Sequence, residues 1–259
     1  MSETRTLGYA IEQEDRESLD RHGEEPLKLL ATFKEELSPQ NPDADPLGVV
    51  NILNQGSIGS CQGQSLAKMF QVCFFLKTGR VFNFSAMCGY VVAQKYDGLI
   101  NRGDVGSTLS GGQRVATENG MCLESDWPYP SRYSNQIVAS SFPFRLKSAK
   151  PTNNPDMILE ALAAGLPVQT GMAWNSELEQ ERVTNYTGRG ARGGHATTLW
   201  LRKDNQICHI NSWGNWNGDG CSTWTEEALR QIVSYRGNTF VIYAPDGIEY
   251  PELPPVETP

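Results

Sequence analysis

The chain has 259 residues, 39% of them apolar, and a net charge of −8. This length suffices for one large domain or for two lobes that share a core. The negative charge and the lack of a basic cluster argue against a nucleic acid partner, because phosphate binding relies on grouped Lys and Arg. No apolar run approaches the roughly 18 residues of a membrane span, and the polar N-terminus lacks the apolar core of a secretory signal. We therefore expect no membrane partner and a cytoplasmic location.

The first 45 residues form a charged extension with one expected helix. Pro26 suits the first turn, and apolar residues follow at helical spacing as far as Leu37. A linker rich in proline and aspartate then leads into the main body, residues 46–245. Three roles fit this helix: docking on the main body, inhibition, or contact with a partner protein.

Residues 46–135 contain a glycine-rich loop followed by helices. The helix that starts at Cys61 buries an apolar face and stops at Gly79, a residue suited to the left-handed cap conformation. Two further helices are expected at residues 85–96 and 110–119, where apolar residues again recur at helical spacing.

Residues 136–245 have the pattern of antiparallel strands, because short apolar runs alternate with glycine, asparagine and charge. The expected strands lie at residues 165–174, 195–202, 206–213 and 238–245. Two helices are expected among them, at residues 155–164 and 226–232. Helices in the first half and strands in the second predict an α+β protein of two lobes, with its ligand site in the cleft between them. Residues 246–259 are expected to be an extended or disordered, proline-rich tail.

Most of the six cysteines are interpreted as reduced thiols, because a chain of this length needs no disulfide framework. The six stand at positions 61, 73, 88, 122, 208 and 221. Cys73 and Cys88 lie in apolar stretches, where free cysteine acts as a small buried hydrophobe. The spacing of Cys208, His209 and Cys221 fits no familiar zinc pattern. We expect neither a metal site nor a cofactor.

Cys61 is the candidate nucleophile. It follows a glycine-containing loop and opens a helix, whose unpaired N–H groups and dipole stabilise an anion, so the pKa of its thiol should be lowered. His195 begins an apolar strand after a glycine-rich loop and can serve as the base. Asn211 ends the following strand, where its amide oxygen would lie beside His195 and fix the histidine tautomer. Trp213 would then shield that hydrogen bond from water.

Acyl transfer also needs a donor for the oxyanion. Gln55 precedes Cys61 by six residues on the same loop. Its side-chain amide and the backbone N–H of Cys61 would stabilise a tetrahedral intermediate. Together these residues indicate nucleophilic catalysis at a carbonyl group.

Four segments resemble motifs of the papain family of cysteine peptidases. NQGSIGSCQGQS resembles the loop around the nucleophile, GGHATTLW the histidine strand, and INSWGNWNGDG the segment with the asparagine. GMCLESDWPYP is similar to the turn before the sheet lobe, mostly as it occurs in bacterial and viral members. The intervals from Cys61 to His195 and to Asn211 are 134 and 150 residues, in agreement with the roughly 130–150 residues typical of papain. The resemblance covers about residues 46–245.

The resemblance implies a papain-like fold with a helical lobe, an antiparallel β-barrel-like lobe and the active site in the cleft. It implies a cysteine endopeptidase that acts on peptide or protein substrates. Cys61, His195 and Asn211 match the catalytic triad, and Gln55 matches the oxyanion glutamine.

Substrate-binding residues are also implied. The family has a glycine pair that hydrogen-bonds the substrate backbone on the non-primed side, and this pair falls near Gly106 and Ser107 when counted back from Gly120. By appearance, the pair Gly111–Gly112 fits it better, and both assignments stay open. Trp213 would line the primed side.

Several departures from the family pattern leave alternatives open. Ile58 replaces a loop cysteine that is normally disulfide bonded, which supports a reducing environment, and Gln62 replaces the tryptophan after the nucleophile. The long inhibitory propeptide has no counterpart, since only some 45 residues precede the core. The alternatives are a papain-fold structural or binding component, for example within a virus particle, and acyl transfer to an amine.

Overall fold

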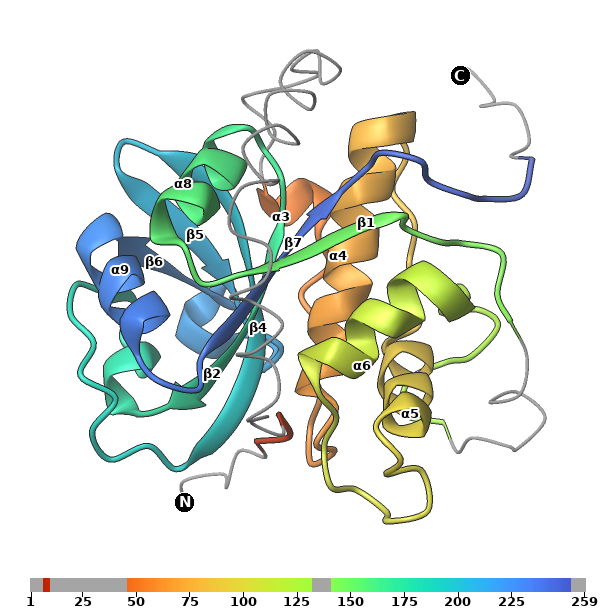
Figure 1. The fold of residues 1–259 in the computed structure, drawn as a ribbon, viewed down its shortest axis with the longest axis horizontal. Helices are drawn as coiled ribbons and strands as arrows, with labels where there is room; N and C mark the ends of the chain where they lie inside the picture. The colour runs from red at the N-terminus through yellow and green to blue at the C-terminus, as the bar shows by residue number, and fades with distance from the viewer. Residues whose placement is uncertain (1–6, 10–45, 132–140, 253–259) are drawn as a thin grey trace.

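The computed structural model describes residues 7–9, 46–131 and 141–252, and these residues form a helical lobe and a sheet lobe (Figure 1). The expected helix from Pro26 to Leu37 and the end of the tail lie outside the described residues. Among the residues that are described, no helix is long and apolar enough to span a membrane.

The helical lobe confirms the three helices predicted for the first half. A short helix, α3 Pro46–Val49, comes first. The three predicted helices are α4 Cys61–Thr78, α5 Ala86–Tyr96 and α6 Leu109–Arg114, and a π-helical turn at Val115–Asn119 continues α6. Gly79 ends α4 in the left-handed conformation with φ 68°, and its N–H bonds the carbonyl of Phe75. The Ser85 hydroxyl caps α5 by accepting from the N–H of Cys88.

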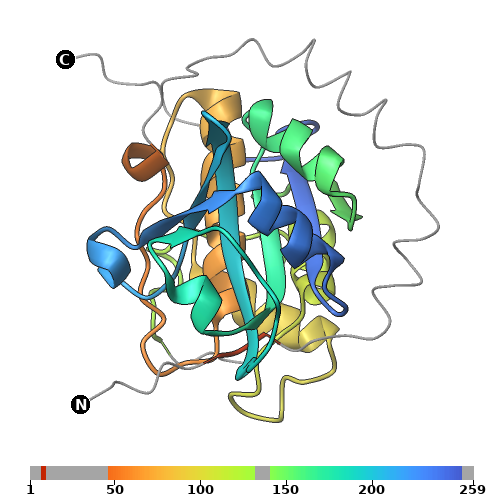
Figure 2. The same ribbon diagram turned by 90° about the vertical axis from the view of Figure 1, so that its left-hand side faces the viewer.

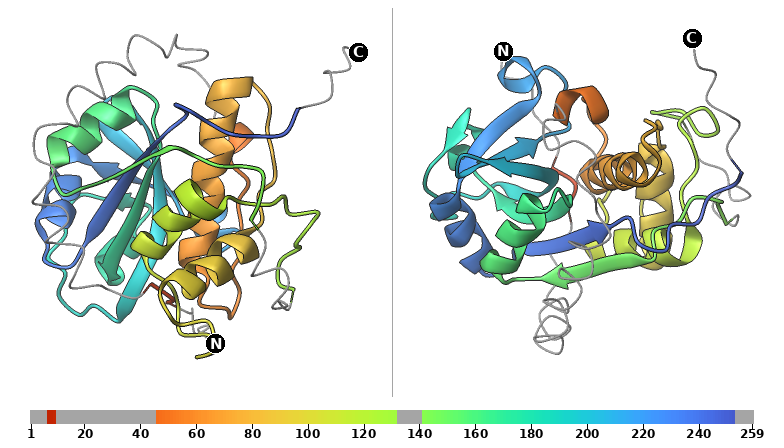
Figure 3. Two further views of the ribbon diagram at one scale, coloured as in Figure 1. Left: turned by 45° about the vertical axis from the view of Figure 1, so that its right-hand side comes forward. Right: turned by 90° about the horizontal axis from the view of Figure 1, so that it is seen from above.

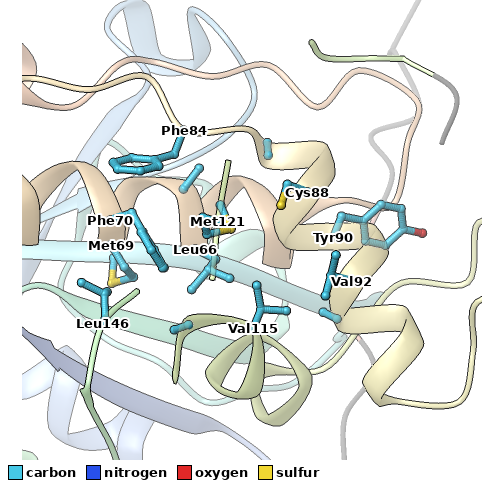
Figure 4. Packing of buried hydrophobic residues seen from close by; sticks show 14 of the residues in the cluster. Leu66, Met69, Phe70, Phe84, Cys88, Tyr90, Val92, Val115, Met121 and Leu146 are labelled. Atoms are coloured by element: carbon cyan, nitrogen blue, oxygen red, sulfur yellow. The ribbon is translucent and has the colours of Figure 1, made fainter. Parts of the chain in front are cut away.

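Helix α4 is the centre of this lobe and is buried from Cys61 to Phe74. Its residues Leu66, Met69 and Phe70 pack against side chains of α5 and of the segments that follow α6 (Figure 4). Phe84 lies against the ring of Phe74, with centroids 5.1 Å apart. Burial of these side chains stabilises the lobe by roughly 1.5–3 kcal/mol for each large apolar residue.

The sheet lobe contains the strands predicted from the four apolar runs and three more. The bounds are β1 Ser148–Thr152, β2 Val168–Trp174, β3 Arg182–Val183, β4 Gly193–Lys203, β5 Gln206–Ile210, β6 Cys221–Thr225 and β7 Thr239–Ala244. Within the described residues the strand order is β1-β7-β2-β4-β5-β6-β3. All pairs are antiparallel except β3 with β6. The α+β class is therefore confirmed, but the sheet is open at β1 and β3 and does not close into a barrel.

Helices cover the sheet on both faces. The predicted helices α8 Pro155–Ala163 and α9 Glu226–Ser234 pack on one face, over a core that includes Trp224 and Phe240 (Figure 2). Helix α4 packs on the opposite face, and seen from above it stands end-on beside the sheet (Figure 3). The start of α4 and the start of β4 thus meet between the two lobes.

The first part of the predicted tail returns to the helical lobe. Glu249 and Arg145 exchange two backbone hydrogen bonds of 2.9 and 3.1 Å. The Glu249 carboxylate also pairs with Lys147 at 2.6 Å, and the ring of Tyr250 lies 5.7 Å from that of Phe74. Residues up to 250 are extended as expected, but they are attached to the protein body.

We predict that Gly63→Ala destabilises the protein by about 1–3 kcal/mol, the usual cost of overpacking. A Cβ at Gly63 would lie 2.3 Å from the carbonyl oxygen of Ala86 and 2.5 Å from the nitrogen of Tyr90, so α5 would have to move. In a helix without such a neighbour the same change stabilises by about 0.5–1 kcal/mol. Urea unfolding of both proteins measures the sign, and a stabilised variant would contradict the close helix contact.

Candidate active site

Cys61 is the first residue of α4, as the sequence predicted. Its side chain is fully buried. The sulfur accepts a hydrogen bond from the backbone N–H of Ala196, at 3.4 Å. Because Ala196 follows His195 on β4, this bond brings the thiol to the residue next to the expected base.

His195 and Asn211 are joined by a hydrogen bond of 2.8 Å between Nε2 and Oδ1. The Asn211 Oδ1 atom also accepts from the backbone N–H of Ser212 at 2.7 Å. A backbone N–H can only donate, so this second bond fixes which amide atom of Asn211 is oxygen. Nε2 of His195 must then be the donor, and in the neutral imidazole the lone pair is on Nδ1. Nδ1 is buried without a hydrogen-bond partner among the described residues, so it can accept a proton.

Aromatic rings surround this histidine. Trp213 stacks on the imidazole with ring centroids 4.6 Å apart and planes 22° apart. Trp174 meets the imidazole edge-on at 4.7 Å. The shielding role predicted for Trp213 is consistent with this stacking, since the indole covers the imidazole that bonds Asn211.

Gln55 is held in the loop before α4 by bonds at both ends of its amide. Its nitrogen donates to the carbonyl of Ile58 at 3.1 Å, and its oxygen accepts from the Ser212 hydroxyl at 2.8 Å. The Gln55 backbone N–H also donates to the carbonyl of Ser212 at 2.9 Å. The expected oxyanion donor is therefore tied to the residue that follows Asn211.

Residues 7–9 lie across the thiol, which the sequence analysis did not foresee. The backbone of Gly8 lies beside the sulfur of Cys61 and acts to lower the pKa of the thiol, as an N–H group does. The carbonyl of Gly8 accepts from the N–H of Ser107 at 3.1 Å, and the N–H of Tyr9 donates to the carbonyl of Gly194 at 3.1 Å. One short segment is thus bonded to the helical lobe and to the sheet lobe at once.

The side chain of Tyr9 fills a pocket in the sheet lobe. A Cβ at Gly171 would lie 2.4 Å from the Cζ atom of Tyr9, so the pocket exists because Gly171 has no side chain. The phenol hydroxyl bonds Oγ1 of Thr239, the residue directly opposite Gly171 on β7. The sequence signal for this contact is slight: two bulky apolar residues, Leu7 and Tyr9, in a polar extension.

The two candidate glycine pairs lie in different places. Ser107 binds the backbone of the segment, and a Cβ at Gly106 would lie 2.0 Å from the carbonyl oxygen of Gly8. Gly111 and Gly112 are inside α6, where Gly112 packs against the side chain of Gln62. The pair found by counting, Gly106–Ser107, is the one beside a bound peptide backbone.

Burial dominates the electrostatics of the site. It raises the pKa of Cys61 to about 11, although backbone N–H groups including that of Gly8 act in the opposite direction. Burial also lowers the pKa of His195 to about 4, against the opposing hydrogen bond from Asn211. The expectation of a lowered thiol pKa is therefore wrong for this closed state, because loss of water outweighs the helix N-terminus. Both groups are neutral at pH 7.

The sequence analysis also missed a buried polar layer beneath the histidine. Lys68 of α4 donates to the carbonyl of Asn211 at 3.1 Å. His209 lies on β5 and is fully buried, with Nδ1 2.7 Å from the Ser222 hydroxyl. The signal for Lys68 was a charged residue in the apolar helix, seven positions after Cys61. Among the described residues, no cluster of His, Cys, Asp or Glu suits a metal ion.

Solved structures of cysteine proteases share this fold. Xylellain, from Xylella fastidiosa, has a TM-score of 0.63 and 20% identity, over 94% of this chain and 93% of xylellain. The protease CMS1MS2 of Carica candamarcensis, solved in complex with E-64, has a TM-score of 0.60 and 17% identity, over 76% of this chain and 94% of that one. Digestive procathepsin L 3 from the larval midgut of Tenebrio molitor has a TM-score of 0.56 and 17% identity, over 85% and 79%.

No protein-family model and no curated protein matches the sequence. The likeness to solved structures therefore concerns the arrangement of the chain in space. It extends over both lobes, since the match with xylellain covers nearly the whole of each chain. The protein has a papain-like α+β fold.

Proposed function

We propose that this protein is a papain-like cysteine endopeptidase. The observation that carries the proposal is the hydrogen bond from His195 Nε2 to Asn211 Oδ1, because it leaves Nδ1 of a buried imidazole free to act as a base, one residue before the backbone N–H that binds Cys61. A nucleophile, a base and an orienting acceptor are the parts that acyl transfer by a thiol requires. The likeness to several cysteine proteases supports the same reading.

The reaction begins with transfer of the Cys61 thiol proton to His195 Nδ1 while the sulfur attacks the peptide carbonyl carbon. The amide of Gln55 and the N–H of Cys61 donate to the oxyanion. The C–N bond then breaks as His195 returns the proton to the leaving amine. Water attacks the thioester, His195 takes a proton from it, the C–S bond breaks, and the sulfur regains its proton.

Residues 7–9 hold this site closed in our proposal. The group of the segment that meets the sulfur is an N–H, whereas the Gly8 carbonyl points to Ser107. A carbonyl carbon is therefore not presented for attack, and the segment occupies the site without being a substrate. Of the roles open to the N-terminal extension, this arrangement favours inhibition.

A structural or binding role is the second candidate. Complete burial of Cys61, His195 and Asn211 is the observation in its favour, since a closed site with neutral groups has no activity by itself. A protein of this kind would co-purify with a large assembly and stay closed under every condition. The cytoplasmic or virus-particle location stays a prediction.

We predict that Cys61→Ala abolishes both peptide hydrolysis and the adduct formed with an epoxide inhibitor when it is introduced together with Gly8→Ala, which displaces residues 7–9 from the thiol. Loss of the nucleophile should lower hydrolysis by at least about 10³-fold. Cys208→Ala with Gly8→Ala is the matched control, because this thiol is half-buried on β5 and has no part in the mechanism. Intact-mass analysis of Gly8→Ala and the two double variants measures the adduct. Labelling of Gly8→Ala that persists unchanged with Cys61→Ala would reject the assignment.

We further predict that Gly8→Ala opens the site. A Cβ at this position would lie 1.9 Å from the carbonyl oxygen of Gly59, so residues 7–9 must leave. Relief of burial lowers the thiol pKa from about 11. Iodoacetamide labelling of Cys61 at pH 7 should then accelerate at least about tenfold, since each pKa unit changes the thiolate fraction tenfold.

Tyr9→Phe is the graded control for this experiment, because it keeps the ring and loses only the hydroxyl bond to Thr239. Its labelling should stay close to that of wild type. In wild type the rate should climb with pH toward about 11, because only the thiolate reacts and burial raises the pKa. A wild-type rate that is already fast at pH 7 and is unchanged by Gly8→Ala would refute the closed state.

A further inference from the structure

Helix α4 carries a polar stripe that begins at the proposed nucleophile and ends at a buried lysine. Cys61, Ser65 and Lys68 stand at positions i, i+4 and i+7, on one face of the helix. Ser65 donates to the carbonyl of Thr197 on β4 at 3.0 Å. Lys68 Nζ donates to the carbonyl of Asn211 at 3.1 Å. The stripe thus connects the helix of the nucleophile to the residue that orients the base.

Lys68 is buried without a carboxylate partner in the part of the chain that the structure describes. Its side chain is 1% exposed. Within the described part of the chain, the Asn211 carbonyl is its hydrogen-bond acceptor and no carboxylate pairs with it. The titratable groups that face it are His195 on β4, His209 on β5 and Cys221 on β6. Burial lowers the pKa of Lys68 to about 7, because an unpaired ammonium is poorly solvated inside a protein.

A positive charge on Lys68 disfavours protonation of both nearby histidines. Burial is the largest cause of the lowered pKa of His195 and of His209, and the charge of Lys68 lowers both further. The pKa of Cys61 responds instead to burial and to backbone N–H groups. A protonated Lys68 therefore opposes the imidazolium of His195 without an equal gain for the thiolate.

We propose that Lys68 is a positioning residue whose charge controls the base: it holds the Asn211 peptide in place and, when protonated, prevents His195 from accepting the thiol proton. This inference rests on the proposed peptidase site. A neutral amine still has N–H donors, so loss of the proton keeps the bond to Asn211 while it removes the opposing charge. Thiolate formation is then switched on as the pH rises through neutrality.

Three full-length proteins test the proposal: Lys68 wild type, Lys68→Met and Lys68→Arg, each with Gly8→Ala to open the site. The readout is the rate of iodoacetamide labelling of Cys61 between about pH 5 and pH 9. With Lys68, the rate should rise through a midpoint near 7. Met has a similar volume and no charge, so the midpoint of labelling in Lys68→Met should fall by at least about one pH unit. At pH 6 this variant should then label about tenfold faster. Arg keeps its charge and should label slowly throughout. An unchanged midpoint in Lys68→Met would overturn the proposal.

The free energy of unfolding gives a second readout that needs no activity. The pKa of Lys68 is about 7 in the folded protein and about 10.5 in the unfolded chain. Between these values unfolding takes up a proton at Lys68, so this residue contributes stability that rises with pH. The buried thiols, whose pKa is raised, act in the opposite direction but equally in wild type and in Lys68→Met. The difference in stability between the two proteins should therefore change with pH from about 7 to about 10.5, and a difference that is constant with pH would also overturn the proposal. If labelling and stability change with pH as proposed but no peptide is hydrolysed, only the peptidase function is refuted.

Discussion

The contact between one face of α4 and strand β4 is the interaction on which the site depends. Two hydrogen bonds cross it, from Ala196 to Cys61 and from Ser65 to Thr197, and a third joins Lys68 of α4 to Asn211, directly after β5. Each joins residues more than 130 positions apart in the chain. Because the helix is buried on the other side against α5, it cannot shift without loss of the core. The start of α4, with Cys61, is therefore held against the part of β4 that carries His195 and Ala196.

The closed state follows from a competition between two electrostatic effects. A helix N-terminus and several N–H donors stabilise a thiolate, each by roughly 0.3–1 kcal/mol for a dipole at a surface. Complete removal of water disfavours the same anion by more, so the pKa of Cys61 rises. Residues 7–9 take part in this burial, because Gly8 bonds the helical lobe and Tyr9 bonds the sheet lobe. Access of water to the thiol is thus the variable that this fold controls.

Gln62, the residue after Cys61, is tied to both lobes by hydrogen bonds. Its side-chain oxygen accepts from the Ser107 hydroxyl at 2.9 Å, and its backbone carbonyl accepts from Gln169 on β2 at 3.1 Å. The same Ser107 binds the carbonyl of Gly8 through its backbone N–H. Gln62 therefore helps to hold the residue on which the segment 7–9 rests.

The sequence by itself determined the helices, four of the strands and the candidate residues Cys61, His195, Asn211 and Gln55, because periodicity, caps and motif spacing are local. It missed β1 and β3, which pair with strands far along the chain, and β6, which pairs with the preceding strand β5. The sequence also predicted a lowered pKa for the Cys61 thiol. This was wrong because a sequence shows where a helix begins but does not show how deeply a residue is buried. Only the tertiary structure decided that Gly8 covers Cys61, that Tyr9 fills the space left by Gly171, and that Lys68 lies under Asn211. These depend on which segments meet in space, and no local pattern encodes that.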